Sequence, residues 1–82
     1  MHKHQIITVG RDFDTIYLGI KEFHPQFVHL LVTKESKLLC APLLSLLSDR
    51  VKVSQDLVGP YDMDGIVSVC ERILAENPED EF

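Results

Sequence analysis

Short apolar runs alternate with segments of helical period along the whole chain. Residues 5–9 and 27–32 are rich in Ile, Val and Leu with little polar alternation, which is typical of interior strands of a parallel sheet covered on both faces. Residues 51–57 alternate between apolar and polar side chains, which favours a less covered strand at a sheet edge. The pattern predicts three strands separated by helices.

The segments between the strands carry helical signals. An apolar stripe follows the first strand and ends before His24-Pro25, with Asp12 as the expected N-cap; its members are Phe13, Ile16, Tyr17, Ile20 and Phe23. The middle segment, residues 36–48, contains Pro42, which costs about 3 kcal/mol in a helix interior. That helix is therefore expected either to kink at Pro42 or to begin near Ala41.

The last periodic segment gives the clearest helix. Asp62 or Asp64 opens it and Asn77-Pro78 closes it. One face of this helix is predicted to be apolar and to comprise Met63, Ile66, Val67, Cys70, Ile73 and Leu74.

The order strand, helix, strand, helix, strand, helix predicts an α/β fold with a parallel sheet. We expect a Rossmann-like three-layer sandwich, a βαβαβα half with strand order 3-2-1 that stops before a fourth strand. Right-handed crossovers would place the first two helices on the same face. At 82 residues, the chain is expected to form one domain, residues 1–82.

Charge and composition exclude several functions. The net charge is -5, and residues 71–82 hold five acids against one base, which is -4 and leaves -1 for the rest. Without a basic patch, direct nucleic acid binding by this segment is not expected. No apolar run approaches the roughly 20 residues of a membrane helix, and no secretory signal is visible, so we expect a cytoplasmic protein without membrane contact. Cys40 and Cys70 are expected to be buried, reduced thiols.

The turn after the first strand is the candidate ligand site, because open α/β sheets bind ligands beyond the carboxyl ends of their strands. Gly10 stands there alone, without the further glycines of a dinucleotide fingerprint. A ligand with spaced phosphates is more plausible, and the predicted binding residues are Thr8, Gly10, Arg11, Asp12, Lys34 and Ser36. In the alternative interpretation Gly10 makes the turn, Asp12 caps the helix and Arg11 is solvated.

Catalytic and metal motifs are absent from the pattern. The serines at positions 36, 45 and 48 lack a histidine and an acid at a defined spacing, so we expect no catalytic residues and no enzyme. His2 and His4 are too few ligands for a metal site, and His29 is interpreted as a hydrogen-bonded structural histidine. No cofactor is expected.

Four segments carry a resemblance to a known family: I-I-T-V-G-R-D-F-D, V-H-L-L-V-T-K-E-S, V-K-V-S-Q-D-L-V-G-P-Y-D-M and L-A-E-N-P-E-D-E-F. Together they resemble the N-terminal half of a CRISPR-associated Rossmann fold (CARF) sensor domain. The likeness extends over nearly all of the chain. It implies binding of a nucleotide second messenger, cyclic oligoadenylate, across a homodimer, and control of an attached nuclease or winged helix DNA-binding domain in antiviral defence or transcription regulation. Thr8, Gly10 and Arg11 match the ligand loop after the first strand.

The chain departs from the family pattern at its end. The family's second ligand motif, a glycine pair followed by Thr and Lys after the fourth strand, is missing, and N-P-E-D-E-F lies where that strand would begin. We therefore expect an N-terminal piece of a longer protein. Two alternatives remain: a ring nuclease that degrades its messenger, with Arg11, Lys34 or Ser36 positioning a ribose hydroxyl, or a structural half-domain without a ligand.

Overall fold

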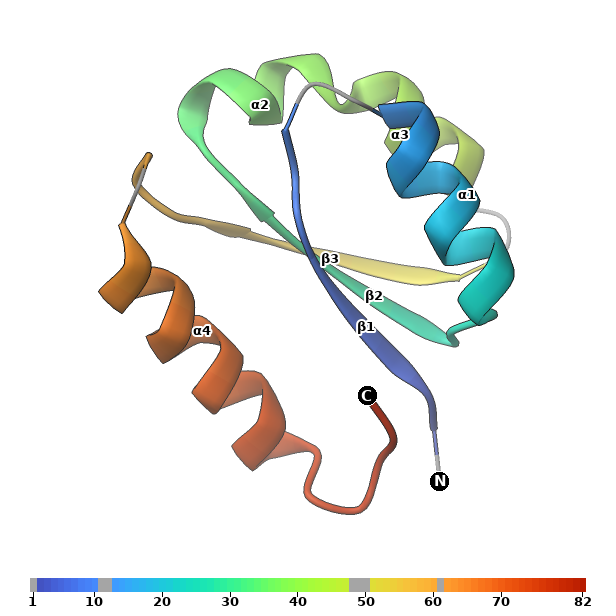
Figure 1. Cartoon of the computed structure of the whole chain (residues 1–82), viewed down its shortest axis with the longest axis vertical. Helices are drawn as coiled ribbons and strands as arrows, with labels where there is room; N and C mark the ends of the chain where they lie inside the picture. Colours follow the sequence, from blue (N-terminus) through green and yellow to red (C-terminus); the bar gives the residue numbers. More distant parts are fainter. Residues whose placement is uncertain (1, 11–12, 48–50, 61) are drawn as a thin grey trace.

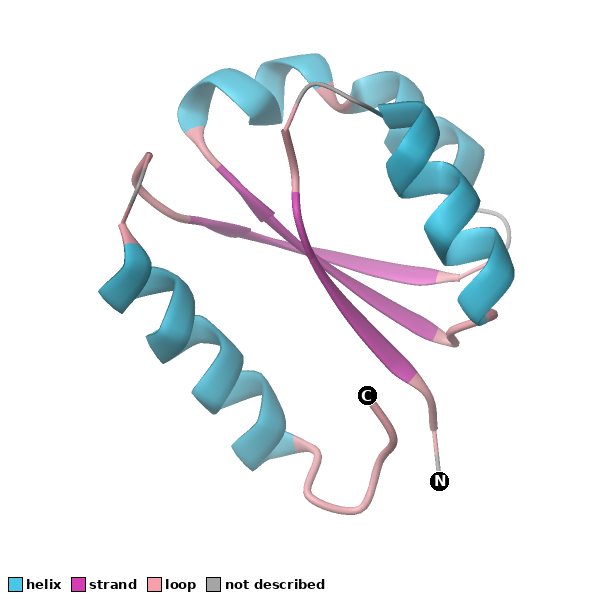
Figure 2. Ribbon diagram, in the orientation of Figure 1, coloured by secondary structure: helices cyan, strands magenta, loops and turns pink. Residues whose placement is uncertain are grey.

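The computed structural model describes residues 2–10, 13–47, 51–60 and 62–82. Its elements in chain order are β1 (His4–Thr8), α1 (Phe13–Phe23), β2 (Phe27–Val32), α2 (Lys34–Leu39), α3 (Ala41–Leu47), β3 (Lys52–Leu57) and α4 (Met63–Glu76). The strands, magenta in Figure 2, form one parallel sheet. Their order in the sheet is β1-β2-β3. The predicted α/β class and the predicted strand order 3-2-1 are confirmed.

Helices cover the two faces of the sheet unequally. The helices α1, α2 and α3 lie on one face, and α4 lies on the other (Figure 1). This arrangement makes three layers, and it places the helices of the first two crossovers on the same side, as right-handed connections require.

The two faces of the sheet differ in chemistry because successive side chains of a strand point to opposite faces. Val28, Leu30 and Val32 of β2 are almost completely buried and pack with Leu43 and Leu47 in the main apolar core. The next residues along the same strand face α4, and the partners of His29 in the register are Ile6 of β1 and Ser54 of β3. The face under α4 therefore mixes polar side chains with apolar ones such as Leu31, which is 2% exposed.

The middle helical segment is divided into two helices. α2 ends at Leu39, Cys40 follows with φ -90° and ψ 3°, and α3 begins at Ala41. Pro42 is the second residue of α3, where its missing N–H removes no helical hydrogen bond. The expectation of a helix start near Ala41 is correct, and a short helix precedes it.

β1 lies at the edge of the three-stranded sheet, as the order 3-2-1 requires, although its apolar run is typical of an interior strand. Its other side begins to pair with the end of the chain, through a parallel bridge between Lys3 and Glu81. The His4 N–H donates to the Glu81 carbonyl oxygen at 2.7 Å, and the Glu81 N–H donates to the carbonyl oxygen of His2 at 2.9 Å. Main-chain pairing thus starts in the segment where the sequence indicated the beginning of a fourth strand.

α4 buries only part of its predicted apolar stripe. Asp62 caps the helix by accepting a hydrogen bond from the Gly65 N–H, and Ile73 is 2% exposed. Met63, Val67 and Leu74 are between 48% and 66% exposed. Apolar burial therefore holds α4 less firmly than the helices on the other face. Among the described helices, none has both the length and the apolar character to cross a bilayer.

Candidate functional site

Two neighbouring hollows lie at the carboxyl ends of the strands. The first, of about 150 Å³, lies between β1 and β2 and is lined by Val9, Gly10, Thr33, Glu35, Ser36 and Leu39. The second, of about 430 Å³, lies between β2 and β3 and is lined by Thr33, Lys34, Glu35, Leu57, Val58, Gly59 and Pro60. Thr33 and Glu35 contribute to both, so the two hollows form one region, which we call the carboxyl-edge site. The predicted residues Gly10, Lys34 and Ser36 come together in it.

Gly10 leaves open space at the carboxyl-edge site. A Cβ atom built on Gly10 would meet no atom within 4 Å. The residue is exposed and directly follows the buried Val9. A larger side chain would therefore fit at position 10 without disturbing the fold. A ligand that approaches the backbone would nevertheless benefit from the missing side chain.

Ser36 and Thr33 bind each other in a capping box at the start of α2. The Thr33 N–H donates to Ser36 Oγ at 2.8 Å, and the Ser36 N–H donates to Thr33 Oγ1 at 3.2 Å. Ser36 is only 7% exposed. This pairing satisfies helix N-terminal groups without a ligand. Of the exposed charged residues beside it, Lys34 lines the second hollow with a cation and Glu35 lines both hollows with a carboxylate.

The other predicted residues are placed differently. Thr8 is exposed at the end of β1, on the opposite sheet face from Val9, and it lines neither hollow. Arg11 and Asp12 lie outside the described residues, as does the expected capping by Asp12.

The carboxyl-edge site offers binding groups rather than reacting groups. Val9 and Leu39 supply apolar wall, Lys34 supplies a cation, and Gly10 supplies accessible backbone. None of the described histidines lines either hollow. The described residues therefore provide no pair of a nucleophile and a histidine base there.

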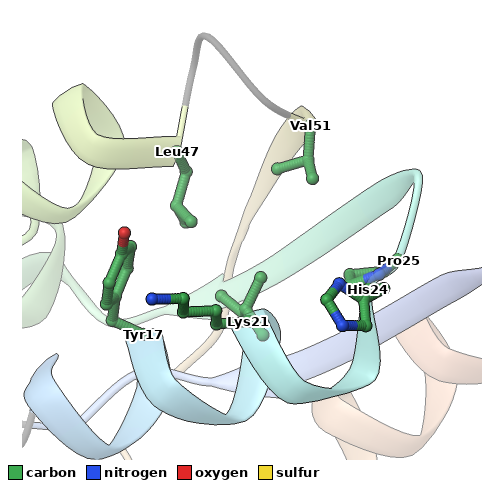
Figure 3. A pocket seen from close by; sticks show the side chains of 7 residues that line it. Tyr17, Lys21, His24, Pro25, Leu47 and Val51 are labelled. Carbon is green, nitrogen blue, oxygen red and sulfur yellow. The ribbon is translucent and has the colours of Figure 1, made fainter.

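A third hollow lies on the α1 side of the sheet, between α1, α3 and the start of β3. It measures about 260 Å³, and its lining comprises Tyr17, Ile20, Lys21, His24, Pro25, Leu47 and Val51 (Figure 3). Lys21 extends along the floor toward Tyr17 in this view. His24 has φ 54°, in the left-handed region where a chain often leaves a helix. None of the ligand residues predicted from the sequence lines this hollow.

A hydrogen-bonded chain of side chains crosses the face of the sheet under α4, and the sequence analysis missed it. Asp80 Oδ2 lies 2.7 Å from His4 Nε2, His4 Nδ1 lies 2.8 Å from His29 Nε2, and His29 Nδ1 lies 2.9 Å from Ser54 Oγ. We call these four residues the histidine relay. The relay links all three strands to the segment that follows α4.

Aromatic rings enclose the inner histidine of the relay. His4 is 2% exposed, and its ring stacks on Phe27 and on Phe82 with centroid distances of 4.7 Å in both cases. Burial, and next the neighbouring His4, lower the pKa of His29. Hydrogen bonds from the His2 N–H and from His4 lower the pKa of Asp80. His29 therefore favours its neutral form and Asp80 its carboxylate.

A metal site is not formed by this cluster. Within the ranges that the structure describes, no group of three or more His, Cys, Asp or Glu side chains could hold a metal ion. The only sequence signal of the relay is that His4, His29 and Ser54 occupy strand positions that share one face of the sheet. Their alignment depends on the strand register, which the sequence pattern alone did not give.

No protein-family model matches this chain, and no curated protein matches its sequence.

Proposed function

We propose that this chain is a ligand-sensing and dimerisation module that binds cyclic oligoadenylate, or a related nucleotide, at the carboxyl-edge site. The observation that carries the proposal is the convergence of Gly10, Lys34 and Ser36 around two joined hollows at the carboxyl ends of parallel strands. Crevices at this edge of open α/β sheets are where such folds take their ligands. In the proposed role, binding regulates an attached effector or a winged helix DNA-binding domain in the cytoplasm.

The chemistry of the carboxyl-edge site suits a nucleotide with separated phosphates. Val9 and Leu39 give a base an apolar surface, and Lys34 gives a phosphate a positive charge. Gly10 lets a ligand come close to the backbone, because nothing fills the space beside it. A pyrophosphate held on the first turn of α1 is disfavoured, since Asp14 already supplies negative charge there.

Homodimerisation is part of the proposal because a cyclic oligonucleotide can present the same groups in two-fold symmetric positions. A ligand of that symmetry can meet one copy of the same site on each of two protomers. Each protomer would then contribute half of the contacts.

Calorimetric titration of the protein with cyclic tetra-adenylate and cyclic hexa-adenylate tests the proposal, with linear tetra-adenylate as the reference ligand. Lys34→Ala and Arg11→Ala are each expected to weaken binding by about tenfold, because each removes a cation that a phosphate can pair with. Lys37→Ala is the matched control, because Lys37 is exposed in the same helix as Lys34 and lines neither hollow. Equal effects of Lys34→Ala and Lys37→Ala would contradict the assigned site.

One observation favours the alternative of a structural half-domain. Thr33 and Ser36 satisfy each other's backbone and hydroxyl groups, so the α2 start is complete without a ligand. Under that alternative neither cyclic nucleotide binds. Chromatography of the same mixtures separates the enzymatic alternative, because a ring nuclease would yield linear products from the cyclic ligand.

A further inference from the structure

The donors and acceptors of the histidine relay fit one arrangement when both histidines are neutral. Asp80 is an acceptor, so His4 Nε2 must carry its proton and His4 Nδ1 must accept. His29 Nε2–H then donates to His4 Nδ1 at 2.8 Å, and the Ser54 hydroxyl donates to His29 Nδ1 at 2.9 Å. Every hydrogen bond of the relay is satisfied, and each donor points toward Asp80.

A first added proton is also accommodated. With His4 as the imidazolium, His4 Nδ1–H donates to His29 Nε2, and His29 Nδ1–H donates to Ser54 Oγ. Only the direction of these two bonds reverses. The new positive charge lies beside the Asp80 carboxylate at 2.7 Å, which strengthens the contact.

A second proton breaks the relay. Both histidines are then donors at every ring nitrogen, so two N–H groups oppose each other where the nitrogen atoms lie 2.8 Å apart. His4 cannot easily turn away, because its ring is stacked between Phe27 and Phe82. Separation of the two N–H groups by movement of His4 requires Phe82 to leave its stacked position, and the segment that holds Asp80 moves with it.

We propose that His4 and His29 form a pH-operated clamp on residues 80–82: the segment stays paired with β1 while the two histidines share at most one proton, and it is released when both are protonated. The device is independent of nucleotide binding at the carboxyl-edge site.

The charged and titratable groups around the clamp come from β3, from α4, from the segment after α4 and from the N-terminal residues. Asp80 on the segment after α4 holds His4, while the His2 N–H and the His2 ring both favour the Asp80 carboxylate. Asp56 of β3 and Glu76 of α4 favour the protonated form of His29, and Arg72 of α4 opposes it. Lys52 of β3 sits over the Phe27 ring at 5.5 Å. Burial and His4 outweigh the two acids, because the pKa of His29 is lowered overall.

The sign of the pH dependence follows from these shifts. A histidine whose pKa is lowered in the docked state stabilises that state fully above its ordinary pKa of 6.5, and the stabilisation is lost as the pH falls from there toward the lowered value. Asp80 has a pKa below its ordinary 3.8, so its carboxylate contribution is lost only in stronger acid. Release between pH 6.5 and 4 therefore reports the histidines rather than Asp80.

Amide hydrogen exchange measured by NMR between pH 7.5 and about 4.5 tests the clamp. The reporter is the Glu81 N–H, which bonds to His2, and the internal control is the Val9 N–H, which bonds to Leu31 at the other end of β1. After correction for intrinsic exchange, Glu81 protection is expected to fall about tenfold relative to Val9 as the pH drops below the ordinary histidine range. A constant ratio of the two protections would overturn the proposal.

Two variants separate the histidine pair from general acid effects. His29→Gln keeps a donor and an acceptor on one side chain but binds no second proton, so Glu81 protection should stay high down to about pH 4.5. His24→Asn is the matched control, since His24 is exposed and outside the relay, and asparagine tolerates its φ; it should keep the wild-type profile. If His29→Gln loses Glu81 protection as the wild type does, the clamp is not formed by this pair.

Discussion

The His4 N–H donates to the Glu81 carbonyl oxygen at 2.7 Å, on the side of β1 that faces away from β2. The Val9 N–H points the other way, to Leu31 of β2. Because N–H directions alternate along a strand, the N–H groups of Ile6 and Thr8 point to the same outer edge as that of His4. An edge of this kind is a template for another strand.

Self-association through the outer edge of β1 is the first prediction. Light scattering should show a mass that rises with protein concentration, and Thr8→Pro should reduce the rise because proline removes an outward N–H without touching the β1–β2 ladder. Gln55→Lys, at an exposed position of β3, is the control variant and should associate as the wild type does. Equal association of the wild type and Thr8→Pro would place the interface elsewhere.

The side chain of Gln5 gives a second prediction. Its Oε1 atom is buried and makes no hydrogen bond with the described residues, and an unsatisfied buried polar atom costs about 1 to 3 kcal/mol. Gln5→Met should therefore raise the free energy of unfolding, by up to about 1 kcal/mol after the partial exposure of Gln5 is considered. Urea denaturation measures the change. Gln55→Met at an exposed position of β3 should leave stability unchanged, and a similar gain there would refute the explanation.

The apolar core under α1 and α3 gives the third prediction. Leu30 is fully buried at the centre of the sheet, and Leu→Ala at such a position costs about 2 to 5 kcal/mol. A chain of this size has a total stability of about 4 to 12 kcal/mol at 0.05 to 0.15 kcal/mol per residue. The Leu30→Ala variant should therefore be largely unfolded at a urea concentration at which the wild type is still folded, as measured by circular dichroism.

The control for Leu30 is an exposed leucine in the helical layer that covers the same face of the sheet. Leu38 is 82% exposed, so Leu38→Ala should change stability by no more than about 0.5 kcal/mol. Comparable losses from the two substitutions would mean that the assigned core is wrong.

Gly10→Ala is the fourth prediction, and it separates folding from ligand binding. The added methyl group meets no atom of the protein, so the midpoint of urea unfolding should not fall. The same methyl group lies at the carboxyl-edge site, so the affinity for a cyclic oligoadenylate should drop if the ligand approaches the Gly10 backbone. Titration calorimetry together with urea denaturation gives both quantities. Unchanged affinity would remove Gly10 from the site.

Much of the architecture could be predicted from the sequence, because periodicity records which sides of an element are covered. The bounds of β2 and α1, for example, follow from the apolar run at 27–32 and from the stripe that ends at Phe23. The break at Pro42 was recognised, but the short α2 before it was not. Its start depends on the local bonds between Thr33 and Ser36, which carry no apolar period.

The candidate site was predictable only in part. Gly10, Lys34 and Ser36 were expected together because parallel strands bring their carboxyl ends to one edge, and the structure places them there. The pairing of His4 with His29 was not expected, because it requires the register of β1 against β2 and the return of Asp80 to the same end of the sheet. Such long-range alignments leave no pattern in neighbouring residues.

The unequal faces of the sheet have a consequence for the way the molecule comes apart. The layer of α1 to α3 is joined to the strands by a continuous apolar core, whereas α4 relies on Ile73 and on directional contacts such as the 2.7 Å bond from Arg72 to Asp56. Directional contacts at an exposed surface are readily exchanged for water. The α4 layer should therefore open first on mild heating, as a separate subglobal event, while the remaining two layers stay folded.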